Sequence, residues 1–155
     1  MIDLRPFNYR DAELLVELVD PVCQEKSIDS IRDLAQSPNH ETIVAEFNKQ
    51  HPVGLLIWEM VDNELHIHFF SFYPRFMREV FELFTNEIKN RLGQKWERII
   101  VRVREKNDHG WIELFKEFGF HILQEDPVIR KYYKDEDAFV MECTERVDVK
   151  IPAHA

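Results

Sequence analysis

The segment Glu64–Asn90, ELHIHFFSFYPRFMREVFELFTNEIKN, decides how the chain is expected to fold. Apolar and polar residues alternate through its first part, which predicts a β-strand ending near Phe72. After Pro74 the apolar residues recur every three or four positions, which predicts an amphipathic helix that ends at Gly93. A strand, a turn and a helix N-terminus in this order are typical of sites for an anionic cofactor, because helix N–H groups point toward the turn.

The expected strand presents different side chains on its two faces, because successive residues of a strand point in opposite directions. One face is predicted to carry Leu65, Ile67, Phe69 and Ser71, and the other His66, His68, Phe70 and Phe72. Alternate aromatic residues of this segment are expected to fill the core between strand and helix. Those on the opposite face are candidates to line an acyl or substrate cavity.

Upstream of this segment, the same patterns predict two helices and three strands. The first helix is expected to begin at Asp11, which is a good N-cap, and to stop at Pro21. The second is expected to begin at Ser27, with Ser27 or Asp29 as its cap. The strands are expected at Ile2–Phe7, Thr42–Phe47 and Val53–Met60. The last two strands and the central strand are separated by short polar connections, so they are predicted to form an antiparallel meander.

Downstream, strands are expected at Trp96–Arg104, Phe120–Leu123 and Ala138–Cys143, with a helix at Asp108–Phe118. The strands at 64–72 and 96–104 are joined by a helix and should therefore be parallel. Together the elements predict one α/β domain over residues 1–145, with a mixed, mostly antiparallel sheet flanked by helices on both faces. Residues 146–155 are expected to form a flexible tail.

The composition excludes several classes of protein. Lys and Arg number 20 and Asp and Glu number 29, giving a formal net charge of −9, which argues against general nucleic-acid binding. No apolar run approaches the roughly 18 residues that a membrane span needs. Cys23 and Cys143 match no metal-ligand spacing and are expected to be free thiols in a reducing compartment. The opening MIDLRPF is no signal peptide, so a cytoplasmic or nuclear location is expected.

Three strings resemble parts of the GCN5-related N-acetyltransferase superfamily, in the same order along the chain. IDLRPFNYRDAELLVEL, from residue 2, resembles its first strand and helix, and WIELFKEFGF (111–120) resembles a later helix and strand. YYKDEDAFVM (132–141) is similar to the C-terminal hairpin of the N-terminal and ribosomal-protein acetyltransferase branch. The resemblance implies transfer of an acetyl group from acetyl-CoA to an amine. It also implies that a bulged fourth strand pairs with the pantetheine arm and that the following helix N-terminus holds the pyrophosphate.

The positions that correspond to this acetyl-CoA site are Phe70, Phe72, Arg75, Met77, Arg78, Glu79 and Asn107, with Asp108 as the alternative to Asn107. The chain departs from the family pattern at two places. The turn Arg75–Val80 contains no glycine, whereas family members use glycines there to bring backbone N–H groups close to the phosphates. Arg75 and Arg78 offer positive charge instead, although Glu79 is negative. Phe115 replaces the tyrosine that often protonates the departing thiolate.

His66 is the candidate general base. Some family members carry a carboxylate at the matching position, and the imidazole pKa suits deprotonation of an ammonium near neutral pH. The alternative is that His66 and His68 lie on a partly exposed sheet face and only form hydrogen bonds. Two histidines at this spacing can also begin a metal site, but no third ligand is apparent in the sequence, so no metal is expected.

Tyr132 and Tyr133 are the candidate substrate contacts, because such tyrosines bind the backbone of the acceptor peptide in the branch that the hairpin resembles. The alternative is that both are ordinary edge-strand residues. The acidic residues nearby are Glu125, Asp126, Glu136 and Asp137, and they suit a cationic amine or a basic peptide.

Two functions therefore remain open. The chain is either an acetyltransferase acting on a small amine or a protein N-terminus, or a non-catalytic binding or regulatory module that has lost acetyl-CoA binding. The sequence does not decide between a monomer and a homodimer.

Overall fold

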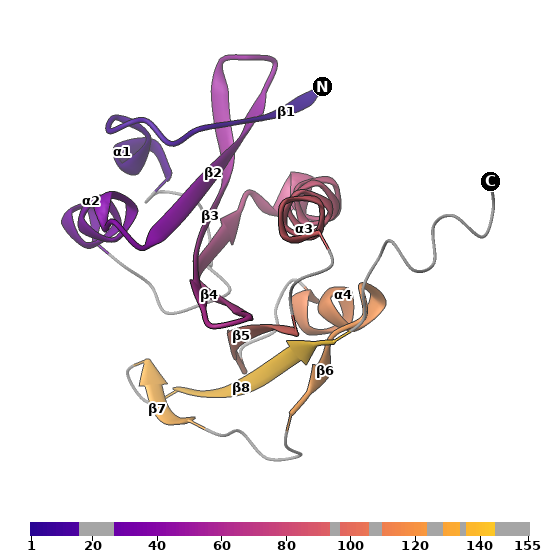
Figure 1. Cartoon of the computed structure of the whole chain (residues 1–155). Coiled ribbons are helices and arrows are strands. Elements are labelled where there is room, and N and C mark those ends of the chain that lie inside the picture. Colours follow the sequence, from indigo (N-terminus) through magenta and orange to yellow (C-terminus); the bar gives the residue numbers. More distant parts are fainter. Residues whose placement is uncertain (16–26, 94–96, 106–109, 124–128, 134–135, 145–155) are drawn as a thin grey trace.

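The computed structural model describes residues 1–15, 27–93, 97–105, 110–123, 129–133 and 136–144 (Figure 1). The described strands are β1 (Ile2–Arg5), β2 (His40–Phe47), β3 (His51–Val61), β4 (Glu64–Phe72), β5 (Arg98–Arg104), β6 (His121–Ile122), β7 (Ile129–Tyr133) and β8 (Glu136–Cys143). The described helices are α1 (Asp11–Leu15), α2 (Ile28–Gln36), α3 (Met77–Leu92) and α4 (Trp111–Glu117), and a 3₁₀ turn, η1 (Pro74–Phe76), precedes α3. The expected stop at Pro21, Cys23 and the expected tail lie outside these residues.

The strands form one sheet in the order β1-β2-β3-β4-β5-β8-β6, and β7 pairs with β8. Among the described strands, only the β4–β5 pair is parallel, and every other pair of neighbours is antiparallel. The predicted mixed sheet is therefore confirmed, and so is the parallel pairing of β4 and β5, the two strands that α3 connects. Among the described residues, no helix is both long and apolar enough to cross a membrane.

Helices cover both faces of the sheet, as predicted (Figure 1). α3 and α4 pack on one face over the larger hydrophobic cluster, which includes residues from β2, β3, β4 and β5. α1 and α2 pack on the other face over a smaller cluster. Gly54 of β3 lies directly under α3, and a Cβ at this position would come within 2.7 Å of Val80 Cγ1. The absence of a side chain at this residue therefore lets the helix approach the sheet closely.

The helix ends follow the expected chemistry with one exception. The Ser27 hydroxyl accepts a hydrogen bond from the Ser30 N–H at 3.2 Å, so Ser27 and not Asp29 caps α2. α3 ends at Gly93, whose φ of 61° favours glycine. Asp11 was predicted to be the N-cap of α1, and this is wrong, because Asp11 is the first helical residue. Its carboxylate binds the Arg5 guanidinium at 2.7 and 2.8 Å.

A β-bulge divides β4 into two halves. Ile57 of β3 lies opposite Phe69 and the next residue, Trp58, lies opposite Ile67, so His68 is an extra residue in β4. The extra residue reverses the alternation of side chains beyond it. Leu65 and Ile67 therefore share the α3–α4 face with Phe70 and Phe72, whereas Phe69 packs toward α1 and α2. The predicted grouping of Phe70 and Phe72 with His66 and His68 is wrong for this reason.

Candidate functional site

The strands β4 and β5 separate at the bulge. Their register runs from Glu64 opposite Arg98 to Ile67 opposite Val101, and the described part of β5 then continues to Arg104 as a partner of β8. The second half of β4, His68–Phe72, has no partner on this edge among the described strands. Its backbone N–H and C=O groups on this side are therefore available to an extended ligand, which can bind them as an added strand would.

Two N–H groups of the turn after β4 form hydrogen bonds within the turn itself. Pro74 has no N–H, the N–H of Phe76 donates to the Tyr73 carbonyl at 2.8 Å, and the N–H of Met77 donates to the Pro74 carbonyl. These bonds close η1 at the start of α3 and occupy donors that a glycine-rich turn would present to a phosphate. Arg75 and Glu79 are exposed, and the Arg75 guanidinium lies 5.5 Å from the centre of the Phe76 ring.

A cavity of about 390 Å³ opens between the N-terminal part of α3 and α4. Met77 and Arg78 line it from α3, and Glu113, Leu114 and Glu117 line it from α4. The Arg78 guanidinium donates to the Glu117 carboxylate at 2.8 Å, so an ion pair joins the two helices beside the cavity. The volume lies within the range of small-molecule sites.

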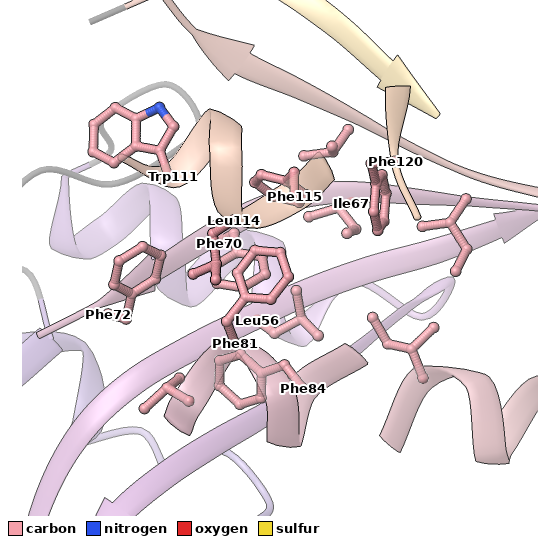
Figure 2. Packing of buried hydrophobic residues seen from close by; sticks show 14 of the residues in the cluster. Leu56, Ile67, Phe70, Phe72, Phe81, Phe84, Trp111, Leu114, Phe115 and Phe120 are labelled. Carbon is pink, nitrogen blue, oxygen red and sulfur yellow. The ribbon is translucent and has the colours of Figure 1, made fainter. Parts of the chain in front are cut away.

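The predicted cofactor residues Phe70 and Phe72 have fully buried side chains on the α3–α4 face (Figure 2). The Phe70 ring packs 5.4–5.8 Å from the rings of Phe72, Phe81, Phe84 and Phe115. Only the backbone of Phe70 and Phe72 remains for contact with a ligand along the edge of β4. Phe115 is itself part of this aromatic cluster and carries no proton to donate.

The candidate base His66 lies in the paired half of β4, opposite Ile100 of β5. Its Nε2 is 3.2 Å from a Glu64 carboxylate oxygen, and the other oxygen of Glu64 accepts from Arg98 Nε at 2.6 Å. The Arg98 hydrogen bond is the main reason that the pKa of Glu64 is below its ordinary value. Glu64 is therefore ionised at neutral pH and fixes one nitrogen of His66.

His68 has a different set of neighbours, which sequence reasoning missed. Its Nε2 lies 2.7 Å from Glu59 Oε1, and the His40 ring is 4.9 Å from the His68 ring, centre to centre. Burial is the main cause that lowers the pKa of His68, and the hydrogen bond with Glu59 opposes it. The short connection Val61–Asn63 could have indicated this neighbour. A connection of this length implies a tight hairpin, and the hairpin places Glu59 of β3 beside the two histidines of β4.

The similarity of this chain to known proteins lies in its three-dimensional structure. No protein-family model matches the chain, and no curated protein sequence matches it. Among solved structures, Ard1 from Thermoplasma volcanium superposes with a TM-score of 0.76 at 22% identity, over 91% of this chain and 95% of the other. The ribosomal-protein-S18-alanine N-acetyltransferase from Escherichia coli superposes with a TM-score of 0.72 at 15% identity, over 92% and 93%.

A third structure contains a relevant molecule. PaiA N-acetyltransferase from Thermoplasma acidophilum in complex with coenzyme A superposes with a TM-score of 0.66 at 17% identity, over 94% of this chain and 99% of the other. The fold is that of the GCN5-related N-acetyltransferases. The resemblance found in the sequence is thus confirmed at the level of the acetyltransferase fold.

For three of the predicted site residues, the structure describes no side chain. Asn107, with its alternative Asp108, falls in the gap at 106–109 before α4. Tyr132 and Tyr133 belong to β7, whose backbone pairs with β8 through Tyr133 opposite Glu136, and nothing is described of their side chains. The hairpin expected on the acetyltransferase fold is therefore present in the backbone, whereas the substrate contacts of its tyrosines stay predictions.

Proposed function

We propose that this protein binds the thioester arm of acetyl-CoA along the free edge of β4 and transfers the acetyl group to an amine. The observation that carries the proposal is the bulge at His68 together with the loss of β5 pairing beyond Ile67. A strand edge without a partner, inside a sheet, is a ready site for an extended amide-containing chain such as pantetheine. The likeness to solved N-acetyltransferases, one of them with coenzyme A, supports the same function.

The residues fit the two ends of the cofactor unequally. The edge His68–Phe72 suits the arm, and the Ser71 hydroxyl in this half is buried without a hydrogen-bond partner among the described residues. The turn does not suit the diphosphate in the usual way, since the N–H groups of Phe76 and Met77 are already used. We assign the diphosphate contact to the side chains of Arg75 and Arg78 instead. When bound, acetyl-CoA supplies an acetyl thioester.

The chain's own residues would position and deprotonate the amine. His66 is the proposed proton acceptor, because Glu64 fixes one of its nitrogens and leaves the other to take a proton from the amine. Tyr132 and Tyr133 are the proposed contacts of the acceptor, which we take to be a small amine or a basic peptide N-terminus in the cytoplasm. With Phe115 in the core, the leaving thiolate would take its proton from solvent or the amine.

A second candidate function is a non-catalytic module that has kept the acetyltransferase fold. The occupied N–H groups of the turn and the buried Phe115 favour it. It predicts no binding of any acetyl thioester.

Two ligands separate the proposals. Acetyl-CoA at 100 times its Kd should stabilise the fold by about 2.7 kcal/mol, or roughly 5–10 °C in Tm for a domain of this size. Acetyl-pantetheine lacks the diphosphate. It should bind within about tenfold of acetyl-CoA, a difference of about 1.4 kcal/mol, because only the side chains of Arg75 and Arg78 are assigned to the diphosphate. Absence of a Tm shift with either compound at millimolar concentration would remove the enzyme and leave the non-catalytic module.

Matched variants locate the site. Arg78→Ala should weaken acetyl-CoA and leave acetyl-pantetheine unchanged, whereas Lys116→Ala on the exposed side of α4 should change neither. His66→Gln should abolish turnover with a panel of amines while the Tm shift with acetyl-CoA persists. Normal turnover by this variant would remove His66 as the proton acceptor.

A further inference from the structure

A group of metal-ligating side chains lies on the face of the sheet that α1 and α2 cover. His40 of β2, Glu59 of β3 and His68 of β4 each place one ligand atom within 4.8 Å of the others. Glu59 Oε1 lies between the two rings, 2.7 Å from His68 Nε2 and 3.9 Å from His40 Nε2. The side chains are 13%, 24% and 28% exposed in the order His40, Glu59 and His68, so solvent still reaches them.

The carboxylate of Glu59 has no arginine or lysine beside it. Among the described residues, its ion-pair partners are His40 and His68 alone. The three side chains are only partly exposed, and a buried or half-buried charge is costly unless it is paired or coordinates a metal. A cation bound among the two imidazole rings and the carboxylate would provide that partner.

His40 is also incompletely bonded. Its Nδ1 is buried and has no hydrogen-bond partner in the described part of the chain. The distance of 3.9 Å from Nε2 to Glu59 is longer than a hydrogen bond. Among the described residues, therefore, neither ring nitrogen of His40 has a hydrogen bond, and Nε2 is the nitrogen that faces Glu59.

We propose that His40, Glu59 and His68 bind a divalent transition-metal ion, with Zn²⁺ as the best fit. Two imidazole nitrogens and one carboxylate are an established zinc ligand set, with a fourth position left to water. Zinc–ligand bonds of about 2.0–2.1 Å in a tetrahedron place ligand atoms about 3.3 Å apart. The observed separations of 2.7 and 3.9 Å lie on either side of this value, so each changes by about 0.6 Å on binding.

The sheet holds the ligands in place. His40 and Glu59 are direct partners in the β2–β3 register, and the bulge puts His68 next to Glu59 even though His66 is the register partner of Glu59. His66 is not part of the group, because it faces Glu64. No third ligand is apparent from spacing along β4 itself, because His40 and Glu59 lie on the neighbouring strands β2 and β3.

The test uses the full chain after removal of metal with EDTA and dialysis, in the absence of any acetyl-CoA. Titration with ZnCl₂ by calorimetry should give one site per chain and raise Tm. His40→Gln and His68→Gln should each weaken Zn²⁺ binding by at least ~10-fold, because even loss of an outer partner of a ligand costs that much. His66→Gln and the exposed His51→Gln should bind as the wild type does.

A second measurement does not depend on stability. Co²⁺ in place of Zn²⁺ should give the strong visible absorption of a four-coordinate ion, and this absorption should disappear in the His68→Gln variant. Failure to bind Zn²⁺ at millimolar concentration would overturn the proposal, and so would equal affinity in the His40→Gln, His68→Gln and His51→Gln variants. Since no thioester is present, either outcome is independent of acetyl transfer.

Discussion

The two faces of the sheet are built from the same strands but carry different kinds of side chain. The face under α3 and α4 is filled by aromatic rings, with Phe70 among four neighbours within 6 Å. The face under α1 and α2 has a smaller apolar cluster and, beside it, His40, Glu59, Glu64, His66, His68 and Arg98, which we call the polar strip. One strand therefore contributes aromatic core residues to one face and part of the polar strip to the other.

The largest difference in the free energy of unfolding is expected between substitutions at two residues of β4 that belong to opposite faces of the sheet. Phe70→Ala should lower the free energy of unfolding by about 3–5 kcal/mol, because it leaves a cavity within packed rings. His68→Gln, two positions away on the polar strip, should cost at most about 1.5 kcal/mol, since it removes one hydrogen bond from a half-buried group. Urea unfolding followed by circular dichroism measures both. Equal costs would mean that the polar strip contributes as much to stability as the aromatic face.

A smaller effect is expected where β3 meets α3. Gly54→Ala should cost about 1–3 kcal/mol, because the new Cβ would lie 2.7 Å from Val80 and 3.3 Å from Phe84. The cost should fall by more than about 0.5 kcal/mol in a Val80→Ala background, where the nearest atom is gone. The four unfolding curves of this double-mutant cycle provide the check, and strictly additive costs would contradict the close approach of α3.

The smallest effect is expected at the end of the polar strip, where Glu64 binds Arg98. The pKa of Glu64 is lowered, so the pair contributes stability above the ordinary value of 4.5, and this contribution is lost as pH falls through the lower folded-state pKa. Arg98→Met should therefore lower the urea midpoint slightly near pH 7 and have less effect below about pH 4. Midpoints at several pH values test this. A constant difference from pH 7 to 3 would show that Arg98 acts through packing.

Much of the fold was predictable, because it depends on short-range patterns. Ser27, Pro74 and Gly93 mark the beginning of α2, the turn before α3 and the end of α3 in the way that local backbone chemistry requires. The parallel pairing of β4 and β5 followed from a helix between two strands. The resemblance of three short strings supplied the rest of the architecture, including the C-terminal hairpin.

The site was predicted less well, because it depends on pairing between strands. Nothing in the local sequence marks His68 as an extra residue, since a bulge is defined only by the partner strand. Phe70 and Phe72 were assigned to the wrong face of the sheet because the alternation was counted without this extra residue. The grouping of His40 and Glu59 with His68 depends on the same register and was likewise invisible to spacing rules along the chain.

The bulge at His68 also affects how this chain would be aligned with a protein of the same fold that has no bulge at this point. Before His68 the core positions of β4 on the α3–α4 face are Leu65 and Ile67, and after it they are Phe70 and Phe72, so their parity changes. A relative without the extra residue would keep one parity throughout. Its alignment with this chain would need a one-residue gap in the middle of a strand, where gaps are ordinarily avoided. Without that gap, residues of the α3–α4 face would be matched to residues of the α1–α2 face, and the shared fold would leave little trace in percentage identity.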